Sequence, residues 1–99
     1  MTTGRVIAVT GAGSGIGRAT ARAFLAMGDR VALLGRRAGT LEETAQGHSG
    51  ALVLPCDVTQ EAAVDAAFAR IGAEFGRLDV LFNNAGMSAK AAPIDEIPV

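Results

Sequence analysis

The sequence predicts an α/β fold in which helices cover both faces of a doubly wound parallel sheet. Short apolar runs alternate with segments of helical periodicity, and glycine-rich turns separate the two. The apolar runs are continuous rather than alternating, which is typical of strands buried on both faces. Because successive strands of this kind are joined by right-handed crossovers, we expect a parallel sheet of about four strands in the order 3-2-1-4, an incomplete version of the doubly wound arrangement.

The first half of the chain supplies two strands, at residues 6–9 and 31–34, each followed by a helix. Gly28 stands where a helix C-cap glycine belongs. Thr40 with Glu43 three residues later matches a capping box, which predicts the start of the second helix. The first helix, which starts at Ile16, is predicted to bury a stripe made of Ile16, Ala19, Thr20, Ala23, Phe24 and Met27, with Arg18 and Arg22 off the stripe.

The second half repeats the pattern with strands at residues 51–54 and 78–82. Thr59 is the predicted N-cap of a third helix, and Gly76 ends it. The residues after position 86 have no strong pattern and are expected to form a loop. The predicted buried stripe of the third helix consists of Val64, Phe68, Ile71 and Phe75.

Composition excludes several classes of function. Nine basic and ten acidic residues leave a formal net charge of −1, so we expect no nucleic-acid partner. No stretch approaches the ~20 apolar residues of a membrane span, and the apolar run near the N-terminus is too short for a signal peptide. The single cysteine, Cys56, cannot form an internal disulfide, which fits a cytoplasmic location. One histidine and one cysteine cannot supply a His/Cys metal cluster, so no metal ligands are predicted.

A glycine-rich turn, Thr10-Gly-Ala-Gly-Ser-Gly-Ile-Gly17, lies between the first strand and the first helix. A turn at this place brings backbone N–H groups and a helix N-terminus to one point, which attracts a diphosphate. A Walker loop does not fit, because position 12 is alanine and no lysine follows Gly17; G-x-G-x-x-G does not fit, because position 16 is isoleucine. The pattern that fits is Thr-Gly-x-x-x-Gly-x-Gly.

This spacing resembles that of the short-chain dehydrogenase/reductase family, whose cofactor domain is Rossmann-like. Asp57-Val58 after the third strand and Asn83-Asn-Ala-Gly86 after the fourth match two further family motifs, in the same order along the chain. The resemblance covers essentially the whole of residues 5–89. It implies that Asp57-Val58 lies against adenine and that the NNAG segment lines the adenosine side. The implied cofactor-binding set is Gly11, Gly13, Ser14, Gly15, Ile16, Gly17, Asp57, Val58, Asn84, Ala85 and Gly86.

Plainer roles stay open for several of these residues. Gly17 can serve mainly for close packing of helix against strand. Asn83 and Asn84 can satisfy backbone groups at a strand end, and Asp57 can cap a helix.

The residues after the second strand bear on which dinucleotide is bound. NAD-preferring folds place an acid ~20 residues past the glycine motif, where it binds the ribose 2′-hydroxyl. Here that stretch is Gly35-Arg36-Arg37. Arginine pairs with a 2′-phosphate through charge-assisted hydrogen bonds, whereas an acid would repel it. We therefore predict NADP(H) in preference to NAD(H), with Arg36 as first candidate and Arg37 as second; the alternative is that both are solvated surface charges.

The resemblance also implies catalytic residues that this chain does not contain. The family uses a tyrosine as acid/base, a lysine four residues later, a serine and a further asparagine, whereas the chain has no tyrosine. Ser88 and Lys90 follow the NNAG segment too closely to match the family pair. We therefore predict no catalytic residue here and expect residues 1–99 to be the N-terminal part of one domain, with the catalytic part absent. Such a part would expose the edge of its fourth strand, which favours self-association.

The function implied is that of the NADP(H)-binding part of an oxidoreductase that interconverts a carbonyl and an alcohol by hydride transfer. The parent protein is expected to be a homo-oligomer. The alternative is a non-catalytic module that binds a dinucleotide or a partner. A methyltransferase-like nucleoside binder would need an acid after the second strand. Gly35-Arg36 stands there instead, which argues against this class of protein.

Overall fold

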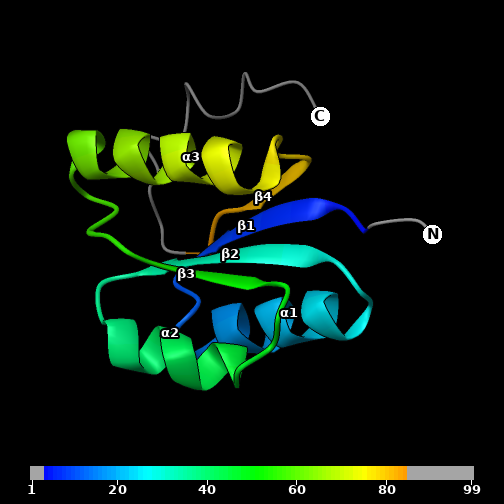
Figure 1. Ribbon diagram of the computed structural model, residues 1–99. Helices are drawn as coiled ribbons and strands as arrows, with labels where there is room; N and C mark the ends of the chain where they lie inside the picture. Colours follow the sequence, from blue (N-terminus) through cyan, green and yellow to red (C-terminus); the bar gives the residue numbers. More distant parts are fainter. Residues whose placement is uncertain (1–3, 85–99) are drawn as a thin grey trace.

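A computed structural model describes residues 4–84 and shows, within them, a four-stranded parallel sheet between two layers of helices (Figure 1). The strand order is β3-β2-β1-β4, and every pair is parallel. The predicted fold class and strand order are therefore confirmed. The elements are β1 (Val6–Thr10), α1 (Gly15–Ala26), β2 (Arg30–Gly35), α2 (Ala38–Ala45), β3 (Ala51–Pro55), α3 (Glu61–Phe75) and β4 (Val80–Phe82).

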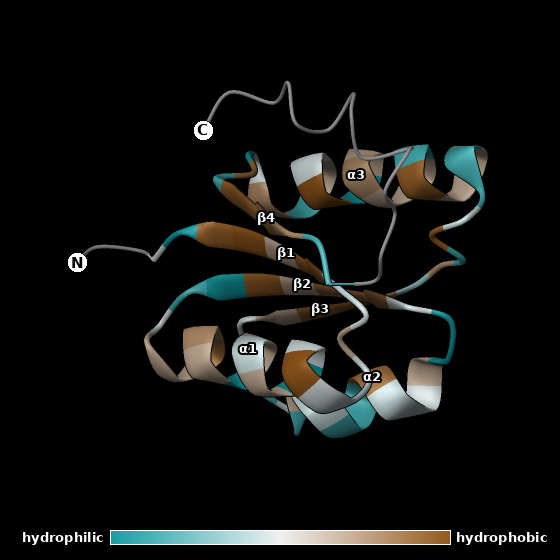
Figure 2. Cartoon of the chain, turned by 180° about the vertical axis from the view of Figure 1, so that it is seen from behind, coloured by the Kyte–Doolittle hydropathy of each residue, from teal (hydrophilic) through white to brown (hydrophobic). Residues whose placement is uncertain are grey.

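The two faces of the sheet have separate helical covers. Helices α1 and α2 lie on one face and α3 lies on the other (Figure 1). Along β1, Ile7 and Val9 pack into the cluster with α1 and α2, whereas Val6 and Ala8 pack into the cluster with α3. All five β1 residues are buried, and the apolar strands lie between the helices in Figure 2. Burial on both faces explains why the strands are apolar without alternation.

The strand register brings the carboxyl ends of the strands to one edge of the sheet. Thr10 of β1 is paired with Leu34 of β2, and Gly35 pairs with Pro55 of β3. Phe82, the last residue of β4, pairs with Val9 of β1. The loops after all four strands therefore share the edge at which doubly wound folds bind ligands.

Most of the predicted buried face of α1 is wrong, although Phe24, which belongs to it, packs partly buried against the core. Ile16 and Met27, which the stripe placed in the core, are 69% and 66% exposed. The buried residues of α1 are Gly17, Ala21 and Leu25. Glycine and alanine let the helix backbone approach the sheet closely, and a stripe drawn through the larger apolar residues does not detect that.

The helix starts also differ from prediction. Helix α2 begins at Ala38, and the Thr40 hydroxyl donates a hydrogen bond of 3.0 Å to the Arg37 carbonyl instead of capping the helix. Helix α3 begins at Glu61 with Gln60 at its N-cap, so Thr59 is not the cap. In both places an extended residue enters the helix with no side-chain cap from the described residues.

The glycine helix ends and the stripe of α3 agree with prediction. Gly28 and Gly76, at φ 90° and 83°, follow α1 and α3 in the left-handed conformation. Val64 and Ile71 are buried, and Phe68 packs partly buried on the same cluster. Even α3, at fifteen residues the longest helix within residues 4–84, is too short to cross a membrane.

Candidate functional site

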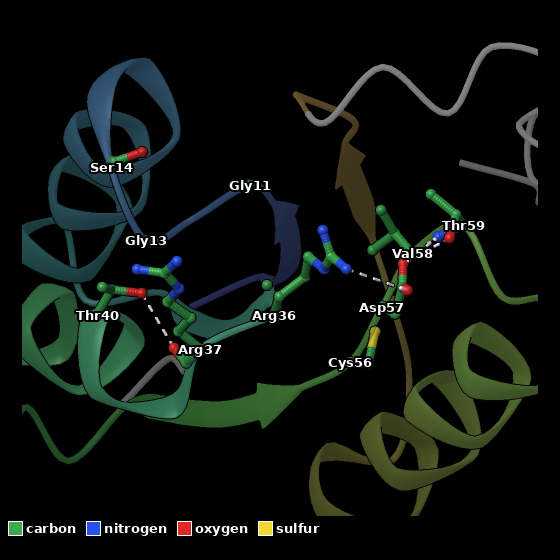
Figure 3. A pocket seen from close by; sticks show the side chains of 11 residues that line it. Gly11, Gly13, Ser14, Arg36, Arg37, Thr40, Cys56, Asp57, Val58 and Thr59 are labelled. Carbon is green, nitrogen blue, oxygen red and sulfur yellow. Dashed lines mark hydrogen bonds and ion pairs between the residues drawn. The ribbon is translucent and has the colours of Figure 1, made fainter.

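A pocket of about 510 Å³ opens at the carboxyl edge of the sheet, beside the ends of β1, β2 and β3 (Figure 3). The glycine-rich turn, the arginine pair and the Asp57-Val58 pair, predicted from three separate segments, all meet here. The lining residues are Gly11, Gly13, Ser14, Gly35, Arg36, Arg37, Thr40, Cys56, Asp57, Val58 and Thr59.

The other residues of the predicted binding set lie elsewhere. Gly15 and Ile16 open α1 beside the pocket without lining it. Gly17 and Asn84 lie behind the turn, next to each other. The last two predicted residues, Ala85 and Gly86, are outside the described part of the chain.

The turn between β1 and α1 depends on backbone conformations that favour glycine. Gly11 and Gly15 have φ of 64° and 57°, in the left-handed region. The turn leads into α1 at Ser14, and no acidic residue stands in the first helical turn. The first N–H groups of a helix have no partner within it and carry partial positive charge. The pocket therefore meets a helix end that favours an anion.

Gly17 is required for close packing. A Cβ atom at Gly17 would overlap the carbonyl oxygen of Gly11 and lie 2.9 Å from Nδ2 of Asn84. The neighbouring oxygen belongs to the backbone, so it cannot move away as a flexible side chain would. This packing role is the plainer interpretation that the sequence left open.

Thr10, at the end of β1, holds the segment that follows β4. Its buried hydroxyl donates to Oδ1 of Asn83 at 3.0 Å and accepts from the N–H of Asn84 at 2.8 Å. These two hydrogen bonds join residues that lie 73 and 74 positions apart in the sequence. The two asparagines thus satisfy polar groups at the strand ends, which fixes where the segment after β4 leaves the sheet.

Asp57 accepts hydrogen bonds from the segment that follows it. Its carboxylate accepts from the Thr59 N–H at 3.0 Å and the Thr59 hydroxyl at 2.6 Å, and Nη2 of Arg36 lies 3.8 Å away. The Thr59 hydroxyl, the Thr59 N–H and the Arg36 charge hold the pKa of Asp57 below its ordinary value, in that order of importance. Asp57 is therefore an anion on the pocket wall and not the cap of α3. The pKa of the adjacent Cys56 thiol is raised, by burial first and then by the Asp57 charge.

The two arginines after β2 face different parts of the pocket. Arg36, with its side chain 78% exposed, reaches across to Asp57. Arg37 extends toward the glycine-rich turn and lies near Gly13 and Thr40 in Figure 3. One cation thus faces the third strand and the other faces the turn.

Sequence reasoning missed four lining residues. Gly35, Cys56, Thr40 and Thr59 flank the predicted motifs at the carboxyl ends of β2 and β3. The two threonines were interpreted as helix caps. For Thr59 a usable signal was its place in the loop after β3, because loops after parallel strands all open on the same edge of the sheet. Thr40 lies within α2, so this signal does not apply to it.

The comparison with protein families decides the family. The sequence model of the short chain dehydrogenases matches residues 5–98. The chain belongs to this family. A relative, 2-(R)-hydroxypropyl-CoM dehydrogenase of Xanthobacter autotrophicus, is 50% identical over 92 residues, which cover 88% of this chain and 37% of that protein. The chain therefore spans little more than a third of this relative's length.

Solved structures of the same fold include complexes with both nicotinamide cofactors. The 3-ketoacyl-(acyl-carrier-protein) reductase of Brucella melitensis, complexed with NADH, aligns with a TM-score of 0.76 and 36% identity over 80% of this chain and 33% of that one. Actinorhodin polyketide ketoreductase with NADPH aligns with a TM-score of 0.79 and 36% identity over 87% of this chain and 35% of that one.

Proposed function

We propose that residues 1–99 are the cofactor-binding, N-terminal part of a single domain in an oxidoreductase that interconverts a carbonyl and an alcohol. The observation that carries this proposal is the pocket in which a helix N-terminus meets the two arginines after β2. A dinucleotide has an anionic diphosphate and an adenosine end, and both find complementary walls here. When bound, the nicotinamide supplies the hydride chemistry, while the protein positions it.

The proposed contacts follow the three walls of the pocket. The turn at Gly13 and Ser14 and the N-terminus of α1 would hold the diphosphate through backbone N–H groups. Asp57 and Val58 would line the adenine end of the site. The fit is supported by the left-handed glycines, which bring backbone rather than side chains to the phosphates.

We propose a preference for NADP(H) over NAD(H). The related structures bind one or the other cofactor, so the likeness alone does not choose between them. The support comes from β2, which ends at Gly35 and is followed by Arg36 and Arg37 with no acid. Two guanidinium groups attract a 2′-phosphate and can bind it in a bidentate manner.

Both arginines are proposed to share the phosphate from different starting positions. Arg37 already extends toward the turn (Figure 3). Arg36 is engaged with Asp57, but the pair is exposed and 3.8 Å long, so breaking it costs little. Arg36 can therefore move to the phosphate at little cost in stability.

Titration of NADPH and NADH against the unaltered chain, Arg36→Ala and Arg37→Ala tests this proposal. Loss of one charge-assisted hydrogen bond, about 1.5–3 kcal/mol, should weaken the affinity for NADPH about 10- to 150-fold and leave the affinity for NADH nearly unchanged. Arg70→Ala is the matched control, because Arg70 pairs with Glu74 on α3, outside the residues that line the pocket. Equal NADPH affinity in all four proteins would remove both arginines from the site and overturn the preference.

A non-catalytic dinucleotide-binding module is the second candidate, because the pocket accounts for cofactor binding alone. Both candidates bind a dinucleotide, so binding does not separate them. The coding sequence after Val99 does: an in-frame serine followed by Tyr-x-x-x-Lys supports the oxidoreductase, and a stop codon supports the module.

A further inference from the structure

Arg18, at the end of the first turn of α1, joins the glycine-rich turn to α2. Its Nη2 donates to the Gly13 carbonyl at 2.7 Å and to the Thr40 carbonyl at 3.1 Å, and its Nε donates to the Thr44 hydroxyl at 2.9 Å. The guanidinium also lies 3.3 Å from a carboxylate oxygen of Glu43. The side chain is only 27% exposed.

Thr44 extends the same network to the next carbonyl of the turn. Its hydroxyl, on a residue with no exposed surface, donates to the Ala12 carbonyl at 2.7 Å. The consecutive carbonyls of Ala12 and Gly13 are therefore both held by side chains. Gly13 also abuts Thr40, whose side chain occupies the space of a Cβ atom.

Holding these two carbonyls fixes the direction of two N–H groups. In a planar trans peptide the C=O of one residue and the N–H of the next point in opposite directions. The bond from Arg18 to the Gly13 carbonyl therefore turns the Ser14 N–H away from Arg18, and the bond from Thr44 to the Ala12 carbonyl does the same for the Gly13 N–H. Gly13 and Ser14 both line the pocket.

Arg22, one helical turn after Arg18, provides an internal comparison. Its Nε and Nη2 donate to the carbonyls of Thr44 and Glu43 at 3.2 and 2.9 Å, near the end of α2. Both arginines therefore tie α1 to α2 with similar bonds. Only Arg18 also contacts the glycine-rich turn.

We propose that Arg18 is a positioning residue for the diphosphate: together with Thr44 it orients the N–H groups of Gly13 and Ser14 toward the bound ligand. This inference rests on the proposed function. Because the diphosphate is common to both cofactors, Arg18 acts on NADPH and NADH equally, in contrast to the arginines after β2.

The test compares the unaltered chain with Arg18→Met, Arg18→Lys and the control Arg22→Met. Three probes are titrated: NADPH, NADH and adenosine 2′-monophosphate, which carries the adenosine and the 2′-phosphate but no diphosphate. Arg18→Met should weaken both dinucleotides by a similar factor of about ten, equivalent to about 1.4 kcal/mol. Its affinity for adenosine 2′-monophosphate should stay within about twofold of that of the unaltered chain. Arg18→Lys should restore part of the lost affinity for the dinucleotides.

An NMR readout without any ligand accompanies the titrations. The amide signal of Ser14, which shares a peptide unit with the Gly13 carbonyl, should move in Arg18→Met and stay in place in Arg22→Met. A Ser14 signal unchanged in both variants overturns the proposal, whatever the affinities.

The titrations separate failure of this inference from failure of the proposed function. If the unaltered chain binds no dinucleotide, the proposed function is wrong. If it binds them and Arg18→Met behaves like Arg22→Met, only the positioning role is wrong. Equal loss of all three probes in Arg18→Met also overturns it, because a general loosening of the fold does not distinguish the diphosphate.

Discussion

Replacement of Thr10 by valine tests how the end of β1 holds the segment after β4. Valine keeps the shape of threonine but removes the hydroxyl that donates to Asn83 and accepts from the N–H of Asn84. Asn83 is exposed, so water replaces its lost bond cheaply, whereas the half-buried Asn84 N–H loses more. The expected loss of unfolding free energy is about 1–2 kcal/mol, from about 0.5–1.5 kcal/mol for each hydrogen bond.

The measurement is urea unfolding followed by far-ultraviolet circular dichroism. The midpoint should fall while the m-value stays constant, because the variant exposes the same surface on unfolding. In a domain of this size the melting temperature should fall by about 4–16 °C. Thr20→Val on α1, at a half-buried threonine that bonds neither asparagine, should stay within about 0.5 kcal/mol of the unaltered chain.

Hydrogen exchange supplies the site-specific check on Thr10→Val. The Asn84 amide loses its acceptor and should exchange faster, while amides in the middle of β1 should change only with the global stability. A midpoint equal to that of the unaltered chain, together with unchanged Asn84 exchange, would refute the reasoning.

Two further predictions concern packing and charge. Gly17→Ala forces a methyl group onto a backbone oxygen and should lower the free energy of unfolding by about 3 kcal/mol or more. Gly72→Ala, in open space on α3, should raise it by about 0.5–1 kcal/mol. Urea unfolding measures both, and a destabilised Gly72→Ala or a tolerated Gly17→Ala would contradict this reasoning. The Val6 N–H, and secondarily Arg77, hold the pKa of Asp79 below its ordinary 3.8, so this carboxylate stabilises the fold above that value and ceases to do so as the pH falls through its lower native pKa. The stability gap between the unaltered chain and Asp79→Asn should therefore be constant well above pH 3.8 and should narrow as the pH falls through 3.8 and below it, and a gap independent of pH would exclude the effect.

The strands and their order were predictable because they depend on local and general rules. Val6, Ile7, Ala8 and Val9 form a continuous apolar run that suits only a strand covered on both faces. Right-handed crossovers between such strands then leave few topologies. The same rules place every loop after a strand at one edge, which agrees with the family resemblance that assigned the glycine turn and Asp57 to one cofactor site.

The phase of α1 was not predictable from apolar spacing. The predicted stripe contains the larger side chains Ile16 and Met27. The buried stripe instead contains Gly17 and Ala21, because close approach of the helix to the end of β1 leaves no room for more. Which face of the helix packs on the sheet depends on the shape of the sheet surface, and the sequence of the helix alone does not specify that shape.

The sequence by itself determined the fold class, the strand order and the positions of the binding motifs, because burial pattern and glycine spacing are local properties of the chain. Tertiary structure alone decided what the arginines do. Arg18 lay off the predicted stripe, and only the docking of α1 against α2 brings it to the Gly13 carbonyl. Arg36 and Arg37 are neighbours in sequence, yet the arrangement of the surrounding loops directs one to Asp57 and the other toward the turn. Contacts between distant segments depend on how the elements pack, and residue spacing does not encode that.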